Sequence, residues 1–164
     1  MQQKFSSTSQ SFNQNWNTFK VGFGDPNGDY WLGNDVIHNL TQNGGCSVLV
    51  QLQSVENNKW YEAQYSTFIV DPESAGYKLH VGGYSENTTD ALSHHNGMLF
   101  TMYDRDQDTM NGSNCASTYL GGNWYIDCSY ADVNLGLVTG TDLMAWYYLL
   151  PGNFLLSSRL WLTC

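Results

Sequence analysis

Residues 104–140 constrain the fold of this chain more than any other part of it. The stretch is rich in Asp, Asn and Gly and shows neither the period of a helix nor the alternation of a strand. Irregular segments of this length are uncommon in compact domains unless they are functional or cross-linked. Two cysteines, Cys115 and Cys128, lie inside it. We therefore expect regular elements that support one long irregular region, and we expect the function to lie in that region.

The remaining chain predicts short helices followed by strands. The expected caps and inward-facing residues are Ser11 with Phe12, Trp16 and Phe19 for a first helix, and Asn34 or Asp35 with Val36, Ile37 and Leu40 for a second. Strands are expected over residues 47–53, 60–70, 77–83 and 97–102, and residues 143–162 are expected to return to the sheet. This order of elements predicts an α+β domain.

Length and charge limit the function classes. The 164 residues are the size of one domain, and we expect a flexible N-terminus over residues 1–10 followed by a globular domain over residues 11–164. Fifteen Asp and Glu against six Lys and Arg give a formal net charge of −9. Nucleic acids and anionic membranes require a basic surface, so both are excluded as expected partners. No apolar run approaches the roughly 20 residues of a membrane-spanning helix.

Cysteines and glycosylation sequons point to the extracellular space. Four cysteines allow two disulfides in three connectivities: Cys46, Cys115, Cys128 and Cys164. No Cys-x-x-Cys pair is present, which disfavours a zinc site. Sequons make Asn39, Asn87 and Asn111 candidate N-glycosylation sites. Together these features predict a secreted glycoprotein with disulfide bonds.

The segment Asp104-Arg-Asp-Gln-Asp108 carries the sharpest local chemistry. Its three carboxylates are expected to converge on one side of a turning loop. Calcium takes roughly six to eight oxygen ligands, including backbone carbonyls, and Gly112 would let the chain fold around an ion. The spacing is not that of an EF-hand, because Thr109 stands at position 6 and Cys115 at position 12. A solvated acidic loop is the alternative that the spacing leaves open.

Other candidates for chemistry are weaker. Adjacent residues on a strand point to opposite faces, so His94 and His95 are interpreted as a turn with a hydrogen-bonding histidine rather than as a metal or acid–base pair. Ser93 does not lie in a nucleophile elbow, and local spacing cannot place two carboxylates across a scissile bond. We therefore expect no enzymatic activity. A set of aromatic residues fits either a sugar site or ordinary core packing: Tyr119, Trp124, Tyr125 and Tyr130.

Several motifs occur in a fixed order over residues 11–136. They are Phe12-Asn-Gln-Asn-Trp16, Gly22-Phe-Gly24, Gly28-Asp-Tyr-Trp-Leu-Gly-Asn-Asp35, Ile37-His-Asn-Leu-Thr41, Tyr77-Lys-Leu-His-Val-Gly-Gly-Tyr84, His95-Asn-Gly97, Asn114-Cys-Ala116 and Gly121-Gly-Asn-Trp-Tyr125. Each motif is weak alone, but the ordered set resembles the fibrinogen-related domain of ficolins, tachylectins, angiopoietins, tenascins and the fibrinogen chains.

The resemblance implies a fibrinogen C-terminal-like fold. This is a twisted antiparallel sheet with short helices and a long irregular calcium-binding region. It implies a partial domain that lacks the family's N-terminal subdomain. A sheet subdomain is expected at about residues 11–102, and a calcium and ligand subdomain at about residues 103–164.

The same resemblance implies the site residues. The family's calcium ligands are two Asp side chains followed by two backbone carbonyls, which fall on Asp106, Asp108, Met110 and Gly112. A Cys115–Cys128 disulfide and a cis peptide bond before Cys128 are also implied. In lectin members that peptide helps to bind an acetyl group. The residues carried over to such a ligand pocket are Asn114, Cys115, Tyr119, Asp127, Cys128 and Ser129.

The chain departs from the acetyl-binding members in places. Ser129 stands where His is common, and Gly140-Thr141 falls where a Tyr-Ala pair walls the pocket. Cys46 and Cys164 lie outside the family pattern, and they either pair with each other or link chains.

Two functions follow from the resemblance. The first is a secreted, calcium-dependent lectin for acetylated or other carbohydrates, with a role in innate-immune recognition. The alternative is a protein-interaction or adhesion module of receptor–ligand type without a sugar site. In both cases we expect no membrane insertion, and we expect any homo-oligomer to form through regions outside this chain.

Overall fold

The computed structural model describes residues 1–5, 10–128, 130–134, 144–147 and 154–164. Within them lie three α-helices, α1 (Trp16–Val21), α2 (Asn34–Thr41) and α3 (Cys115–Tyr119), and two short 3-10 helices, η1 (Glu73–Ala75) and η2 (Leu92–His95). The strands are β1 (Gln2–Phe5), β2 (Phe23–Gly24), β3 (Tyr30–Trp31), β4 (Ser47–Ser54), β5 (Trp60–Val70), β6 (Leu79–Ser85), β7 (Ala131–Asp132), β8 (Met144–Trp146) and β9 (Phe154–Thr163).

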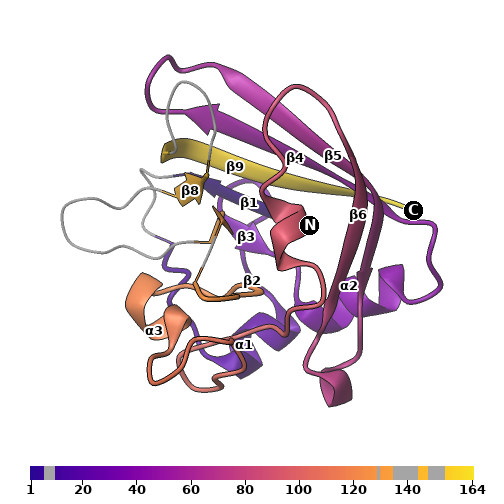
Figure 1. Ribbon diagram of the computed structural model, residues 1–164, viewed down its shortest axis with the longest axis vertical. Helices are drawn as coiled ribbons and strands as arrows, with labels where there is room; N and C mark the ends of the chain where they lie inside the picture. The colour runs from indigo at the N-terminus through magenta and orange to yellow at the C-terminus, as the bar shows by residue number, and fades with distance from the viewer. Residues whose placement is uncertain (6–9, 129, 135–143, 148–153) are drawn as a thin grey trace.

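The described strands form one antiparallel sheet in the order β2-β3-β1-β9-β4-β5-β6, and β8 joins β7 to β9. Figure 1 shows the long strands β4, β5, β6 and β9 together, with α1, α3 and the irregular region on the other side of the molecule. The predicted α+β fold, with short helices and a long irregular region, is confirmed. None of the described helices is long and apolar enough to cross a membrane.

Two expected boundaries are wrong because the chain ends belong to the sheet. Residues 2–5, expected to be flexible, form β1 between β3 and β9. The side-chain amide nitrogen of the buried Gln2 donates to the Val133 carbonyl at 3.1 Å and to the Ser158 hydroxyl at 2.9 Å, which pairs both of its N–H groups inside the fold. Residues 154–163 form β9 between β1 and β4, which confirms that this segment returns to the sheet, although the resemblance placed it in the second subdomain. The sheet is therefore not confined to residues 11–102.

Strands with a clear period of two lie where they are expected. Strand β4 buries Val48, Val50 and Leu52 on one face, as predicted, and β5 spans the predicted residues 60–70. Strand β6 begins two residues later than predicted. The expected strand at residues 97–102 does not form. There, Met98 and Gly97 each bond to Leu79, and Thr101 bridges to Asn123 instead.

The helices differ from the prediction at their ends. Helix α1 begins at Trp16 rather than after Ser11, because the Asn15 side chain accepts from the Thr18 amide at 2.8 Å. Of the three apolar residues predicted to face inward on α2, Ile37 is fully buried, whereas Val36 is 40% and Leu40 49% exposed. This helix has eight residues and packs on β5 and α1 along one edge, so its apolar face is narrower than the sequence indicates.

An aromatic core connects the sheet to the irregular region. Trp31 and Phe100 lie with ring centroids 6.0 Å apart, and Phe100 and Trp124 lie 5.1 Å apart. Phe19 of α1 packs 5.4 Å from Trp31. These rings are buried, so the irregular region is fixed to the sheet by apolar packing as well as by hydrogen bonds.

Candidate functional site

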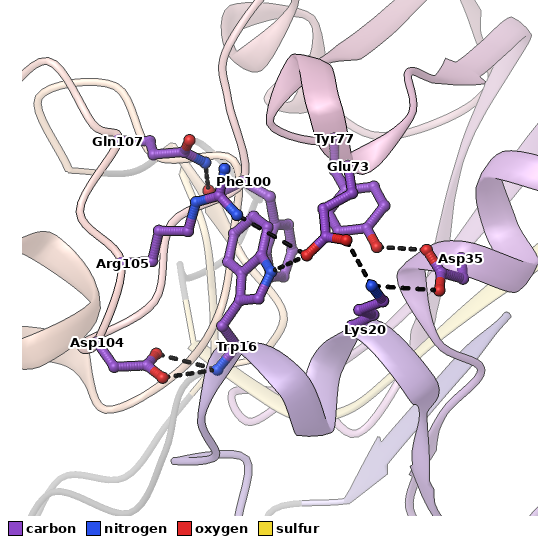
Figure 2. Close-up of polar contacts among 9 residues, drawn as sticks. All are labelled: Trp16, Lys20, Asp35, Glu73, Tyr77, Phe100, Asp104, Arg105 and Gln107. Atoms are coloured by element: carbon purple, nitrogen blue, oxygen red, sulfur yellow. Dashed lines mark hydrogen bonds and ion pairs between the residues drawn. The ribbon is translucent and has the colours of Figure 1, made fainter.

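The acidic loop, residues 104–112, begins with polar side chains that bind other parts of the domain. Both carboxylate oxygens of Asp104 accept from the backbone amide of Trp16, at 2.9 and 3.2 Å (Figure 2). The Gln107 side chain donates to the Phe100 carbonyl at 2.7 Å. Asp104 therefore caps α1, and the expectation that all three carboxylates of this segment converge is wrong.

The two remaining carboxylates lie next to each other. Asp108 accepts from the amide of Met110 with one oxygen and from the amide of Cys115 with the other, both at 2.8 Å. Asp106 accepts from the Asp108 amide at 3.3 Å. Burial raises the pKa of the Asp108 carboxyl, and the nearby negative charge of Asp106 raises it further. A cation between these groups would offset both effects.

The donor set of the loop fits calcium better than a softer metal. Among the residues that the structure describes, no group of three or more His, Cys, Asp or Glu side chains lies close enough to hold a metal ion. An ion at Asp106 and Asp108 would therefore need backbone oxygens, and the exposed backbone at Met110 and Gly112 is the segment expected to supply them. An all-oxygen shell that includes carbonyls is typical of calcium.

Two disulfides are present among the described cysteines. Cys115 pairs with Cys128, as the resemblance implies. Cys46 pairs with Cys164, which decides between the two alternatives for these residues in favour of an intrachain bond. The Cys46–Cys164 bond ties the end of the chain to the start of β4.

Helix α3 and the short disulfide bring several of the predicted ligand residues together. Asn114 caps α3 by accepting from the Ser117 amide at 2.9 Å, and its side-chain amide donates to the Met102 carbonyl at 3.0 Å. Tyr119 is 36% exposed and stacks 6.3 Å from the buried Tyr125. Asp127 is exposed and Cys128 is partly exposed. Asn114 is thus committed to structure, which leaves Tyr119 and Asp127 as the accessible members of the predicted set.

Some predicted features stay predictions. Ser129 and Gly140-Thr141 lie outside the described residues. Cys128 has a positive φ of 64°, rare for a residue with a side chain, and the Ile126 amide donates to its carbonyl at 2.9 Å. The cis peptide bond before Cys128 remains a prediction. The sequon residues Asn39, Asn87 and Asn111 are all exposed.

His95 organises the chain that follows the disulfide. Its Nδ1 lies 2.8 Å from the Trp124 carbonyl, and its Nε2 accepts from the amides of Tyr130 and Ala131 at 3.1 and 3.0 Å. This pattern requires a neutral ring protonated on Nδ1. Burial lowers the pKa of His95 to about 4. The interpretation of His94-His95 as a turn with a hydrogen-bonding histidine is confirmed.

An aromatic ridge, made of His94, Tyr130 and Tyr147, lies beside this histidine. The His94 and Tyr130 rings stack with centroids 4.4 Å apart, and Tyr147 meets Tyr130 edge-on at 5.9 Å. Tyr130 is 38% and Tyr147 44% exposed. The Tyr147 amide also donates to the Tyr130 carbonyl at 2.8 Å, so the two rings are held by their backbones. Sequence reasoning singled out Tyr130 but missed Tyr147. Tyr147 lies seventeen positions after Tyr130 and is not part of a local motif.

A buried acid lies behind Tyr119 and the short disulfide. The Tyr125 hydroxyl is 3.0 Å from both the Asp132 carboxylate and the Gly121 carbonyl, but it has one proton to donate. If Asp132 is protonated, it can donate to Tyr125 while Tyr125 donates to Gly121. Burial raises the pKa of Asp132 to about 7, with the Tyr125 hydrogen bond and Lys4 acting in the opposite direction.

Ionisation of the buried Asp132 is expected to lower stability at neutral and alkaline pH. The variant Asp132→Asn cannot ionise and should not show this loss. The folded pKa of about 7 lies above the reference value of 3.8, so the unfolded chain ionises first and the contribution of Asp132 to stability falls as pH rises from about 4 to about 7. The full loss is roughly 4 kcal/mol. Urea unfolding from pH 4.5 to 8.5 should show the variant gaining on the wild type as pH rises. The exposed Asp127→Asn is the control, and a stability difference independent of pH would contradict the prediction.

Comparisons with known proteins agree with this architecture. Residues 1–146 match the family model described as fibrinogen beta and gamma chains, C-terminal globular domain. Human angiopoietin-related protein 2 is 43% identical over 120 residues, which is 73% of this chain and 24% of that protein. The chain thus spans about a quarter of the length of this relative.

Solved structures have the same fold. The fibrinogen-like globe domain of human ANGPTL2 superposes with a TM-score of 0.89 at 34% identity and covers 99% of this chain and 77% of that one. Lamprey fibrin D-dimer, complexed with the peptide ligand Gly-His-Arg-Pro-amide, superposes with a TM-score of 0.85 at 25% identity and covers 99% of this chain and 59% of that one. The chain belongs to the family of fibrinogen C-terminal globular domains.

Proposed function

We propose that this domain is an extracellular protein-recognition module that binds a basic, extended segment of a partner protein at the aromatic ridge. The observation that carries the proposal is the ridge itself, in which the exposed His94 and Tyr130 rings stack and the exposed Tyr147 ring meets Tyr130 edge-on. Exposed rings attract cations through their faces, and the chain has a net charge of −9. The two disulfides support an extracellular setting.

The relatives support a protein partner better than a sugar. Those that match include angiopoietin-related proteins and a fibrin fragment complexed with a peptide. The carbohydrate interpretation depends on Ser129 and residues 140–141, which lie outside the described residues. Sugar binding is therefore treated as the result that would displace the proposal.

A calcium ion is proposed to order the acidic loop. The side chains of Asp106 and Asp108 and the carbonyls of Met110 and Gly112 would hold it. The ion would neutralise two adjacent carboxylates next to the amide that starts α3, since Asp108 accepts from Cys115. Calcium would supply structural order to the loop, and we assign no catalytic role to it.

The double variant Asp106→Asn/Asp108→Asn is expected to abolish calcium binding. Amides keep the size of the carboxylates and one accepting oxygen in each side chain, but they remove both charges that calcium requires. Isothermal calorimetry should give heat with the wild type and none with the variant. Calcium at about 100 times Kd should also stabilise the wild type alone by about 2.7 kcal/mol. Glu56→Gln, an exposed charge change beyond β4, is the control and should bind normally. Equal binding by the double variant would contradict the calcium site.

The partner class is tested with a defined basic peptide, Gly-His-Arg-Pro-amide. Calorimetry should detect binding to the wild type and at least tenfold weaker binding to Tyr130→Ser and Tyr147→Ser. The control Tyr103→Ser removes a ring that is 46% exposed but lies outside the ridge. Retention on N-acetylglucosamine resin with release by acetate, without peptide binding, would replace the proposal with the lectin interpretation.

A further inference from the structure

The acidic loop is attached to the body of the domain by side chains that are not among its proposed ligands. The Arg105 guanidinium lies 4.0 Å from the centroid of the Trp16 ring, and its Nη1 is 3.9 Å from a carboxylate oxygen of Glu73 (Figure 2). Asp104 accepts from the backbone amide of the same Trp16. These contacts of Asp104 and Arg105 with Trp16 and Glu73 are called the clamp below.

The partners of the clamp are fixed on their other sides. The Trp16 indole donates to Glu73 at 2.8 Å and stacks on Tyr77 with centroids 5.4 Å apart. Lys20, one turn further along α1, binds the second carboxylate oxygen of Glu73. The Lys20 ammonium and the Trp16 indole both hold the pKa of Glu73 below its ordinary value, so Glu73 remains charged. The loop therefore rests on a rigid support built from α1 and η1.

The clamp lies directly beside the proposed ion. Arg105 separates Asp104 from Asp106, and the side chains at 104 and 105 point toward α1 in Figure 2. The backbone between residues 105 and 108 can then present Asp106 and Asp108 in only a narrow range of positions. Preorganising ligands in this way reduces the entropy that ion binding must overcome.

We propose that Asp104 and Arg105 are positioning residues that couple calcium affinity to the packing of α1. This inference rests on the proposed calcium site. Coupling of this kind is reciprocal, so an ion in the loop must also stabilise the contacts of the loop with Trp16.

The variant Arg105→Met separates positioning from simple electrostatics. It removes a positive charge next to Asp106. Because this charge repels calcium, its loss alone would tighten calcium binding. Loss of the clamp predicts the opposite, a Kd about five- to tenfold weaker by calorimetry. The matched control is Lys59→Met, which removes the same charge from an exposed position between β4 and β5, outside the clamp and its supports. It should bind calcium as tightly as the wild type or more tightly.

Hydrogen exchange of the unaltered protein gives a second readout. The Trp16 amide donates to Asp104, so saturation with calcium should slow its exchange about fivefold or more, while the amide of Val50 in β4 stays unchanged. This measurement needs no variant and therefore does not depend on whether Arg105→Met folds.

The possible outcomes separate this inference from the site on which it rests. The positioning role is overturned, and the ion site stands, in two cases. In the first, wild-type protein binds calcium and Arg105→Met binds it equally or more tightly. In the second, wild-type protein binds calcium but the exchange rate of the Trp16 amide does not change. If wild-type protein gives no heat with calcium, both fall. Weaker binding by Arg105→Met, normal binding by Lys59→Met and slowed exchange at Trp16 together support it.

Discussion

The double variant Cys46→Ser/Cys164→Ser is expected to lose about 4–5 kcal/mol of unfolding free energy. The bond closes a loop with a sequence separation of 118, and in the chain-entropy model a loop of about 100 residues contributes about 4.7 kcal/mol. Loss of the bond also frees the end of β9, which lies between β1 and β4. Urea unfolding under oxidising conditions measures the difference.

The short disulfide supplies the comparison. Cys115 and Cys128 are separated by 13 positions, for which the same model gives about 3 kcal/mol. Cys115→Ser/Cys128→Ser should therefore lose less stability than the long-loop variant, although it lies in the functional region. If the order of the two losses were reversed, loop entropy would not be the main contribution of the long bond.

Local sequence patterns predicted the elements whose signal lies within one short segment. Strands β4 and β5 follow from alternation and β-branched or aromatic residues, and they form at the predicted positions. Strand β1 was missed because the side-chain amide nitrogen of its buried Gln2 donates to Val133 and Ser158, both more than 130 positions away. No window of sequence reports such partners. The predicted strand at 97–102 does not form because its backbone groups bond to two separate segments, at Leu79 and Asn123.

The candidate site divides in the same way. Family motifs located the acidic loop and the Cys115–Cys128 bond, because residue order along the chain carries that information. The direction of Asp104 was not predictable, since its partner at Trp16 lies 88 positions away. The aromatic ridge was missed for the same reason, as its rings come from three separate segments.

Replacing His95 by leucine is expected to destabilise the domain by about 4 kcal/mol or more near neutral pH. The ring is fully buried and makes hydrogen bonds to Trp124, Tyr130 and Ala131. Leucine fills much of the volume but leaves a carbonyl and two amides unpaired, and each buried unpaired group costs about 1–3 kcal/mol. The neighbouring His94→Ala removes an exposed ring that stacks on Tyr130 and should cost only about 1 kcal/mol.

The pH dependence distinguishes the lost hydrogen bonds from a general packing defect. His95 has a folded pKa of about 4 against a reference value of 6.5, so wild-type stability falls by roughly 3 kcal/mol as pH drops from about 6.5 to about 4. Asp132 acts with the opposite sign over nearly the same range, and the wild-type curve should therefore be nearly flat there. His95→Leu keeps only the Asp132 contribution, so its stability should rise on acidification. Urea midpoints for His95→Leu that instead stay flat, in parallel with those of His94→Ala, would show that His95 is not held neutral.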